Sequence, residues 1–170
     1  QLEKDEEIVA CFDEVKDDTL VFFTALGNAK RTEGKEFDLR TKKTAAIALK
    51  DDDRVIAVEK QDETAGTVIM VSKGGMSIRF ATDTVPIMGK GAGGVKCMKL
   101  DEGDRVIFAA QIADEGEILT ISDRGYAKRS LVFDYEIQGR NGKGLKTFDF
   151  KKNGSNGTAI AAALYVKEPY

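Results

Sequence analysis

Histidine and tryptophan are absent from the 170 residues of this chain, and proline occurs only twice. Without histidine the chain lacks the commonest general base and metal ligand at neutral pH, which counts against an enzyme. No apolar run approaches the ~18 residues that a membrane-spanning helix needs, and nothing at the start resembles a signal peptide. Hydrophobic residues make up 42% and charged residues 32% of the chain, which predicts a soluble folded protein rather than a disordered one.

Cysteine is equally scarce. Cys11 and Cys97 lie far apart, each in an apolar, strand-like stretch. A domain held together by disulfides would carry more cysteines, so we expect both residues to be buried free thiols. This cysteine usage predicts a cytoplasmic protein.

The net charge is small and negative. At −3 it argues by itself against a nucleic-acid partner. However, residues 1–18 carry eight acidic and two basic side chains, whereas the rest of the chain carries 21 acidic and 24 basic ones. The acidity is therefore concentrated at the start, and the chain beyond residue 18 has a positive balance that is compatible with a polyanionic partner.

Three segments of the chain align with one another around a glycine. Gly27, Gly75 and Gly125 each follow four apolar or β-branched residues and a short polar turn, and they are 48 and 50 residues apart. A second strand-like stretch follows each glycine. Because glycine adopts positive φ without strain, this pattern predicts a β-hairpin in every repeat.

Each repeat continues with a second pair of predicted strands around a polar turn. The pairs are 44–49 and 54–58 in the first repeat, 94–100 and 105–110 in the second, and 144–150 and 158–164 in the third. Residues 7–12 resemble the last strand of a preceding repeat. Four strands in ~50 residues is typical of a propeller blade, and the chain shows no sustained 3.6-residue apolar period that would indicate helices.

We therefore predict an all-β fold of the β-propeller or β-pinwheel type, built from about three ~50-residue repeats with four antiparallel strands in each blade. Three blades cannot close a ring, so we expect a partial wheel. The expected divisions are an acidic lead-in with the last strand of a preceding blade, three blades, and a linker to a following blade. They cover residues 1–18, 19–62, 63–112, 113–164 and 165–170.

One family resembles these repeats closely. Residues 138–145, Gln-Gly-Arg-Asn-Gly-Lys-Gly-Leu, resemble the Gln-Arg-Arg-Gly-Gly-Lys-Gly-Ile/Val box in the tail of DNA gyrase A subunits, from which Gly139 and Asn141 depart. The stretches 75–80, 88–89, 94–95, 103–106 and 125–129 resemble the same tail, so the resemblance extends over residues 19–164. In gyrase the full box lies in the first blade, and topoisomerase IV carries degenerate boxes. The choice between these two enzymes therefore stays open.

The resemblance implies the C-terminal β-pinwheel domain of a bacterial type II topoisomerase A subunit, which wraps DNA around a basic rim. The implied partners are double-stranded DNA, the remainder of the A subunit and the ATPase B subunit, in the cytoplasm at the nucleoid and not at a membrane. The resemblance implies no cofactor for these repeats, because the family uses ATP and Mg²⁺ in other parts of the enzyme. The alternative is a propeller-type protein-interaction scaffold, which the acidic lead-in favours.

A surface that wraps DNA must neutralise phosphates with Lys, Arg and backbone N–H groups. The loop at 138–144 suits this role, since its glycines allow close approach and two of its side chains are cationic. The loops at 90–96 and 40–43 correspond to it. The DNA-binding candidates in these loops are Gln138, Arg140, Gly142, Lys143, Gly144, Lys146, Lys90, Lys96, Lys42 and Lys43. Ordinary solvated turns are the alternative.

Arg31, Arg79 and Arg129 share one register after the turn glycine, so strand alternation places them on a common face. They form either a ladder of phosphate contacts or a solvent face paired with nearby acids. Lys128 is a weaker candidate, because it falls on the opposite face, where the other repeats have Lys30 and Ile78.

Other chemistry is not indicated. Tyr126 is expected to pack on its blade rather than to stack on a base. The acidic turns 51–53 and 101–104 lack the ligand spacing of a calcium loop, and we expect them to be solvated turns away from DNA. The sequence has no nucleophile–histidine pair, no Walker phosphate loop and no zinc-ligand set.

Overall fold

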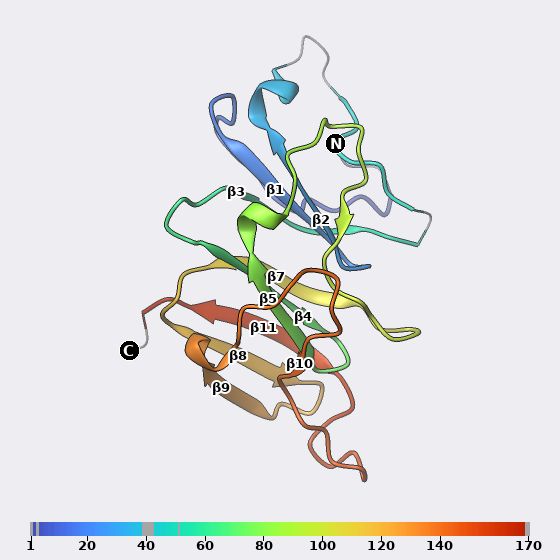
Figure 1. The fold of residues 1–170 in the computed structure, drawn as a ribbon. Coiled ribbons are helices and arrows are strands. Elements are labelled where there is room, and N and C mark those ends of the chain that lie inside the picture. Colours follow the sequence, from blue (N-terminus) through green and yellow to red (C-terminus); the bar gives the residue numbers. More distant parts are fainter. Residues whose placement is uncertain (1, 3, 39–42, 51, 169–170) are drawn as a thin grey trace.

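The computed structural model describes residues 2, 4–38, 43–50 and 52–168. Within these residues the chain forms short strands and single 3-10 turns, which confirms the predicted all-β class (Figure 1). None of the described helices is long and apolar enough to cross a membrane. The strands are β1 (Thr19–Thr24), β2 (Asn28–Glu33), β3 (Val55–Lys60), β4 (Thr67–Ser72), β5 (Met76–Ala81), β6 (Val95–Lys96), β7 (Val106–Ile112), β8 (Glu117–Ser122), β9 (Ala127–Leu131), β10 (Leu145–Lys146) and β11 (Ile160–Val166). The 3-10 turns are η1 (Gly34–Phe37), η2 (Thr82–Thr84) and η3 (Val132–Asp134).

The predicted hairpins open all three repeats. The pairs β1–β2, β4–β5 and β8–β9 are antiparallel. Gly27, Gly75 and Gly125 lie in their turns with φ values of 79°, 82° and 76°. Residues with a Cβ rarely adopt this conformation, so the turn geometry explains why a glycine recurs at this position.

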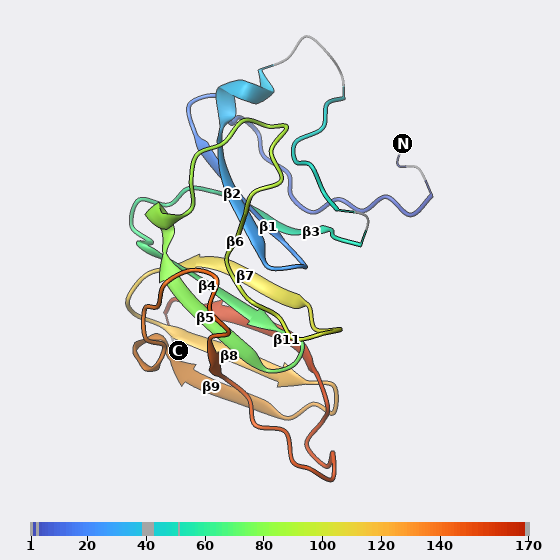
Figure 2. The same ribbon diagram turned by 45° about the vertical axis from the view of Figure 1, so that its right-hand side comes forward.

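The sheets do not coincide with the repeats. Sheet 1 has the strand order β3-β1-β2-β6, sheet 2 the order β7-β4-β5-β10, and sheet 3 the order β11-β8-β9. Since β6 and β10 belong by sequence to the following repeats, sheets 1 and 2 each take their outer strand from the next repeat (Figure 2). Sheets 1 and 2 confirm the four antiparallel strands, and sheet 3 has three within the described residues. The assignment of all four strands to one repeat is wrong.

Backbone hydrogen bonds to the preceding hairpin fix this exchange. The carbonyl oxygen of Gly27 accepts from the N–H of Cys97 at 2.8 Å, and that of Gly75 accepts from the N–H of Thr147 at 2.8 Å. The two contacts are equivalent and lie one repeat apart. Strand exchange is therefore a property of the repeat and not an accident of one loop.

Apolar side chains fill the two layers between the stacked sheets. Val21 and Phe23 of sheet 1 pack with Val68 and Met70 of sheet 2 in the first layer. Ile69 and its neighbours on the other face of sheet 2 pack against sheet 3 in the second layer. The middle sheet is thus buried on both faces, which explains why β4 is a continuous apolar run rather than an alternating one.

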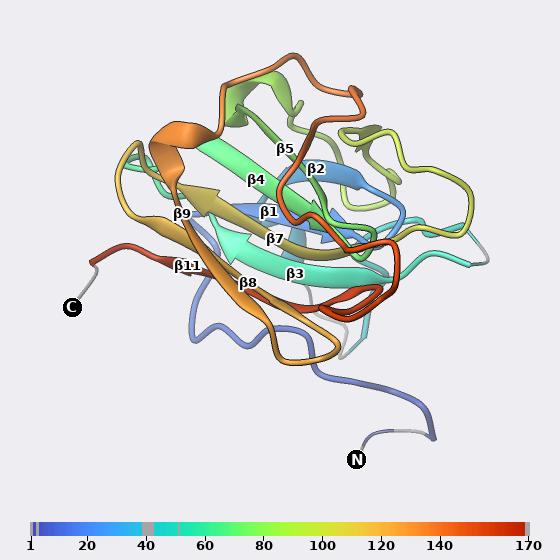
Figure 3. The same cartoon turned by 90° about the horizontal axis from the view of Figure 1, so that it is seen from below.

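The two edges of the stack differ. β7 contacts both β3 and β11, so these three strands form an inner edge. Figure 3 shows them on one side of the molecule, with the orange segment before β10 on the opposite side of the stack. β6 and β10 are the outer strands of their sheets. The loops that precede them therefore lie at the outer edge.

Two predicted strands are not formed. Residues 7–12 and 44–49 have no regular structure. By repeat position both belong to a sheet that a preceding hairpin would begin, and the described residues contain no such hairpin for their N–H and C=O groups to pair with. Cys97 is buried as expected, but Cys11 in the first of these segments is exposed, which corrects its predicted burial.

Candidate nucleic-acid interface

Residues 90–99 and 138–146 form a continuous surface at the outer edge, which we call the rim. The second segment lies directly against the first, because Gly142 forms a parallel bridge with Met98. The N–H of Asn141 donates to the carbonyl oxygen of Cys97 at 2.8 Å, and the N–H of Lys99 donates to that of Gly142 at 2.9 Å. Strand exchange thus joins the cationic loops of two repeats into one ribbon.

Most predicted cations of the rim remain accessible. Lys96 is exposed and donates to the carbonyl oxygen of Leu26 at 2.7 Å. Lys143 pairs with Asp101 at 2.7 Å, and Lys146 pairs with Asp149 at 3.0 Å. These exposed ion pairs contribute little to stability.

Lys99 is a further exposed cation that the sequence analysis missed. It lies on the rim three residues after Lys96. The equivalent residue of the third repeat is Asp149, so no phased cation marked this position. A search limited to repeated charges therefore could not find it.

Two rim cations turn inward. The guanidinium of Arg140 donates through Nη1 to the carbonyl oxygen of Lys96 at 2.9 Å. The Nζ of Lys90 donates to the carbonyl oxygen of Glu36 at 3.5 Å, and Lys90 is half-buried. Both side chains were predicted to supply charge to DNA, and both bind backbone of the preceding repeat.

The predicted rim glycines serve the exchange of strands. Gly94 and Gly144 have φ values of 87° and 76°, and a Cβ on them would lie 2.6 Å and 2.0 Å from the carbonyl oxygens of Ala29 and Ser77. Only glycine lets β6 and β10 approach the preceding hairpin so closely. Gly142 and Gln138 are both partly exposed, and the N–H of Gln138 donates to the carbonyl oxygen of Arg79 at 2.8 Å.

Gly144→Ala is expected to lower the free energy of unfolding by about 2–5 kcal/mol, since it combines left-handed strain with a clash against backbone. Gly125→Ala is the matched control: its φ is also 76°, but no atom lies within 4 Å of its added Cβ. The control should lose only about 1–2 kcal/mol. Urea unfolding followed by circular dichroism measures both, and equal losses would contradict the close approach at Ser77.

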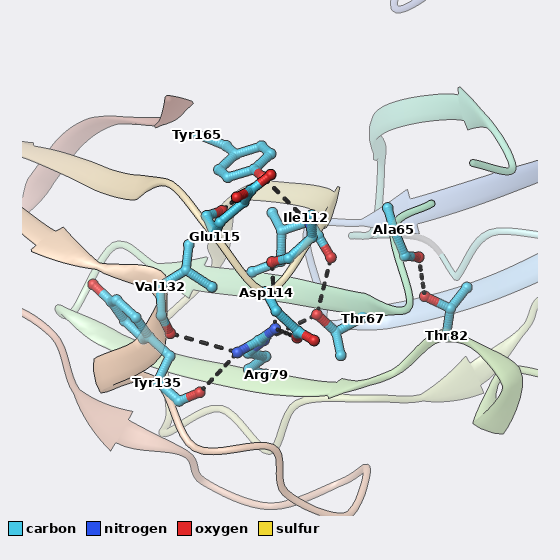
Figure 4. Close-up of polar contacts among 11 residues, drawn as sticks. Ala65, Thr67, Arg79, Thr82, Ile112, Asp114, Glu115, Val132, Tyr135 and Tyr165 are labelled. Atoms are coloured by element: carbon cyan, nitrogen blue, oxygen red, sulfur yellow. Dashed lines mark hydrogen bonds and ion pairs between the residues drawn. The ribbon is translucent and has the colours of Figure 1, made fainter. Parts of the chain in front are cut away.

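The predicted ladder of strand arginines is wrong for Arg79. Its side chain is only 5% exposed. It donates to Thr67 Oγ1 at 2.9 Å, to the carbonyl oxygen of Tyr135 at 3.3 Å and to Asp114 at 2.6 Å (Figure 4). A guanidinium enclosed in this way joins sheet 2 to η3 and cannot reach a phosphate.

The other two strand arginines differ from Arg79 in exposure. Arg31 repeats the junction one sheet earlier, donating to the carbonyl oxygen of Val85 at 2.6 Å and to Gln61 at 3.1 Å. It is therefore committed to the sheet 1–sheet 2 junction rather than to a ligand. Arg129 is exposed and pairs with Glu117, as the alternative of a solvent face predicted.

The remaining candidates lie away from the rim or are tied down. The Nζ of Lys128 donates to the carbonyl oxygen of Thr147 at 3.1 Å. Lys43 is exposed and pairs with Glu6 at 3.2 Å. Lys42, like Arg40, lies outside the described residues. Tyr126 is 54% exposed, so most of the ring is not covered by its blade.

Acidic side chains fix two hairpin turns instead of being merely solvated. Asp53 accepts from the N–H of Leu26 at 2.9 Å, and Asp104 accepts from the N–H of Gly74 at 2.8 Å. Among the described residues no group of three or more His, Cys, Asp or Glu side chains could hold a metal ion. These carboxylates therefore have a structural role at the turn end of the sheets.

Lys30 supports the rim from beneath. It is fully buried, lies over the ring of Phe22 at 5.2 Å, and donates to the carbonyl oxygens of Gly89 and Lys90 at 3.1 and 2.9 Å. Burial lowers the pKa of Lys30 to about 8, and the nearby carboxylate of Glu36 opposes this shift.

Stability should therefore depend on the ionisation of Lys30. Between pH 8 and 10.5 the unfolded chain keeps the proton that the folded chain releases, so this residue's contribution to the free energy of unfolding rises with pH over that window. We expect wild type to gain stability relative to Lys30→Met across this range. Urea unfolding at several pH values, with Lys143→Met as the exposed control, measures the difference. A pH-independent difference would show that burial does not perturb Lys30.

Comparison with known proteins gives consistent matches. The profile of the family described as "DNA gyrase C-terminal domain, beta-propeller" matches residues 18–62, 66–113 and 116–156. The DNA gyrase A subunit of Staphylococcus epidermidis (strain ATCC 12228) is 36% identical over 165 residues, covering 92% of this chain and 18% of that protein. The subunit of Haloquadratum walsbyi is 35% identical over 167 residues, covering 92% and 19%.

Solved structures agree with these sequence matches. The crystal structure of the C-terminal domain of DNA topoisomerase IV superimposes with a TM-score of 0.88 at 26% identity, covering 97% of this chain and 52% of that one. The structure of the DNA gyrase A C-terminal domain superimposes with a TM-score of 0.76 at 28% identity, covering 91% and 51%. The chain thus spans about half of these solved domains and less than a fifth of the two A subunits.

Proposed function

This chain belongs to the family of DNA gyrase C-terminal domains, and from that membership we propose that its rim binds and wraps double-stranded DNA. The proposed role is non-catalytic: it bends a duplex toward the strand-passage gate of a type II topoisomerase. The observation that carries the proposal is the joining of two cationic loops into one ribbon at the outer edge.

The charges of the rim suit phosphate better than base edges. Its exposed cations are all lysines: Lys99 and Lys143 lie on loops, and Lys96 and Lys146 lie on the two-residue strands β6 and β10. None of these elements is long enough to enter a groove and read base edges. Two of the lysines are held by exposed carboxylates, and Lys143 in turn lowers the pKa of Asp101. Phosphates would replace these carboxylates, with little sequence preference and with release of counterions.

Salt dependence of duplex binding tests the proposal. Four lysines that each neutralise one phosphate predict a slope of about −3.6 in log affinity against log salt, or roughly 10²-fold between about 50 and 200 mM salt. Fluorescence anisotropy with two labelled duplexes of unrelated sequence measures the slope and the sequence preference. Affinity that does not change with salt, or the absence of binding at low salt, would overturn the proposal in favour of a protein-interaction scaffold.

We further propose that the whole protein is a bacterial, nucleoid-associated A subunit that acts with an ATPase B subunit, where ATP and Mg²⁺ are used. Its relatives by sequence are gyrase A subunits, which favours supercoiling as the activity supported. A supercoiling assay of the parent enzyme with and without residues 138–144 tests this role. Loss of supercoiling with relaxation intact supports wrapping, whereas unaltered supercoiling would contradict it.

A further inference from the structure

Arg140 differs from the other cations of the third-repeat loop in where its charge is placed. The side chain is half-buried, and its Nη1 donates to the carbonyl oxygen of Lys96 in the preceding repeat at 2.9 Å. Its Nε is buried and makes no hydrogen bond within the described residues. The guanidinium is thus turned toward the protein, whereas Lys143 in the same loop is exposed.

Cys97 lies beneath this contact. The thiol is fully buried, and burial raises the pKa of Cys97 to about 11, although the neighbouring guanidinium of Arg140 acts in the opposite direction. The carbonyl oxygen of Cys97 accepts from the N–H of Asn141, the residue after Arg140, at 2.8 Å. The loop before β10 therefore closes over segment 96–98, with Arg140 at the point of closure.

The second repeat contains an equivalent contact. Lys90, at the position of Arg140, also donates to a backbone carbonyl oxygen of the preceding repeat, that of Glu36. The first cation of each rim loop is therefore half-buried against the preceding repeat, whereas Lys96, which also donates to a carbonyl oxygen of the preceding repeat, and Lys143 are exposed. The contact of Lys90 is a second observation, independent of the geometry of Arg140. It indicates that the first cation of the rim loop attaches that loop to the preceding repeat.

We propose that Arg140 is a positioning residue of the rim and not a phosphate contact. It fastens the third-repeat loop to segment 96–99 of the second repeat, and so holds Lys96, Lys99 and Lys143 in one row. The effect of Arg140 on DNA binding rests on the proposed function. The attachment of the third-repeat loop to segment 96–99 does not, because it is a contact within the protein.

A double-mutant cycle on duplex binding separates the two roles. If Arg140 acts by positioning Lys96, Lys99 and Lys143, Arg140→Gln should reduce the slope of log affinity against log salt by about 2–3. Lys143→Gln should reduce the same slope by only ~0.9. In the background K96Q/K99Q/K143Q, Arg140→Gln should then change affinity less than twofold, since residues that act as one unit are not additive. Arg140→Lys, which keeps a cationic donor, should restore most of the slope. If Arg140 binds phosphate directly, Arg140→Gln should instead remove ~0.9 from the slope in both backgrounds.

Thiol labelling tests the fastening without DNA. In a Cys11→Ser background, which removes the exposed thiol, Arg140→Gln should accelerate the reaction of Cys97 with a disulfide reagent by about 10- to 100-fold through local opening. Lys143→Gln should leave the rate unchanged, and thermal unfolding followed in parallel identifies any global loss of structure. An unchanged labelling rate in a folded Arg140→Gln protein would overturn the proposal. If wild type fails to bind duplex but labelling accelerates, the proposed function is wrong and the fastening stands.

Discussion

Arg79→Met is expected to lower the free energy of unfolding by about 3–5 kcal/mol, because it removes a buried cation and leaves several buried acceptors without a donor. Thr67, the carbonyl oxygens of Val132 and Tyr135, and Asp114 would all lose their hydrogen bonds to the guanidinium. Methionine fills part of the volume but offers no donor. Urea unfolding monitored by circular dichroism measures the loss.

Arg129→Met is the matched control for this prediction. Arg129 has the same register in the third hairpin, but it is exposed and pairs with Glu117. An exposed ion pair is worth at most ~1 kcal/mol, so the control should be nearly as stable as wild type. A similar loss of unfolding free energy at the two positions would mean that any arginine at this position of the hairpin stabilises the fold. The enclosed contacts of Arg79 would then not be the cause.

Replacement of Lys96, Lys99 and Lys143 by glutamine is expected to weaken duplex binding by roughly 500-fold at about 0.1 M salt, since each phosphate contact contributes about eightfold there. The control is Lys73, Lys151 and Lys152 replaced by glutamine, which changes the net charge equally but leaves the rim intact. Anisotropy titrations of both variants against one duplex give the comparison. Equal weakening would point to overall charge and exclude a localised rim.

The hairpins were predictable from sequence because a local rule governs them. A turn that requires positive φ selects glycine, and the selection recurs at Gly27, Gly75 and Gly125. Strand exchange was not predictable in this way. The two residues of β6 or β10 have the same sequence pattern of apolar and polar side chains whether they pair within their own repeat or with the preceding one. Their pairing partner is set by contacts between distant parts of the chain, which a local pattern does not reveal.

The candidate site was only partly predictable, for a related reason. Register places Arg31, Arg79 and Arg129 on equivalent faces, but the burial of each depends on which sheet lies opposite. η3 and the segment between β7 and β8 enclose Arg79, whereas Arg129 is exposed. Lys96 was identified from the phasing of the cationic loops, and Lys143 from the resemblance of residues 138–145 to the gyrase box. Lys99 was missed because neither signal marks it.

Strand exchange also determines how this protein can unfold. Sheet 1 is completed only when residues beyond Gly94 have folded against β2, so neither of the first two repeats can melt without exposing an edge of the other. We therefore expect neighbouring repeats to unfold together and not one at a time. A protease site or truncation introduced at the sequence boundary near residue 62 would strip sheet 1 of its outer strand, whereas one placed after Lys99 would leave that sheet whole.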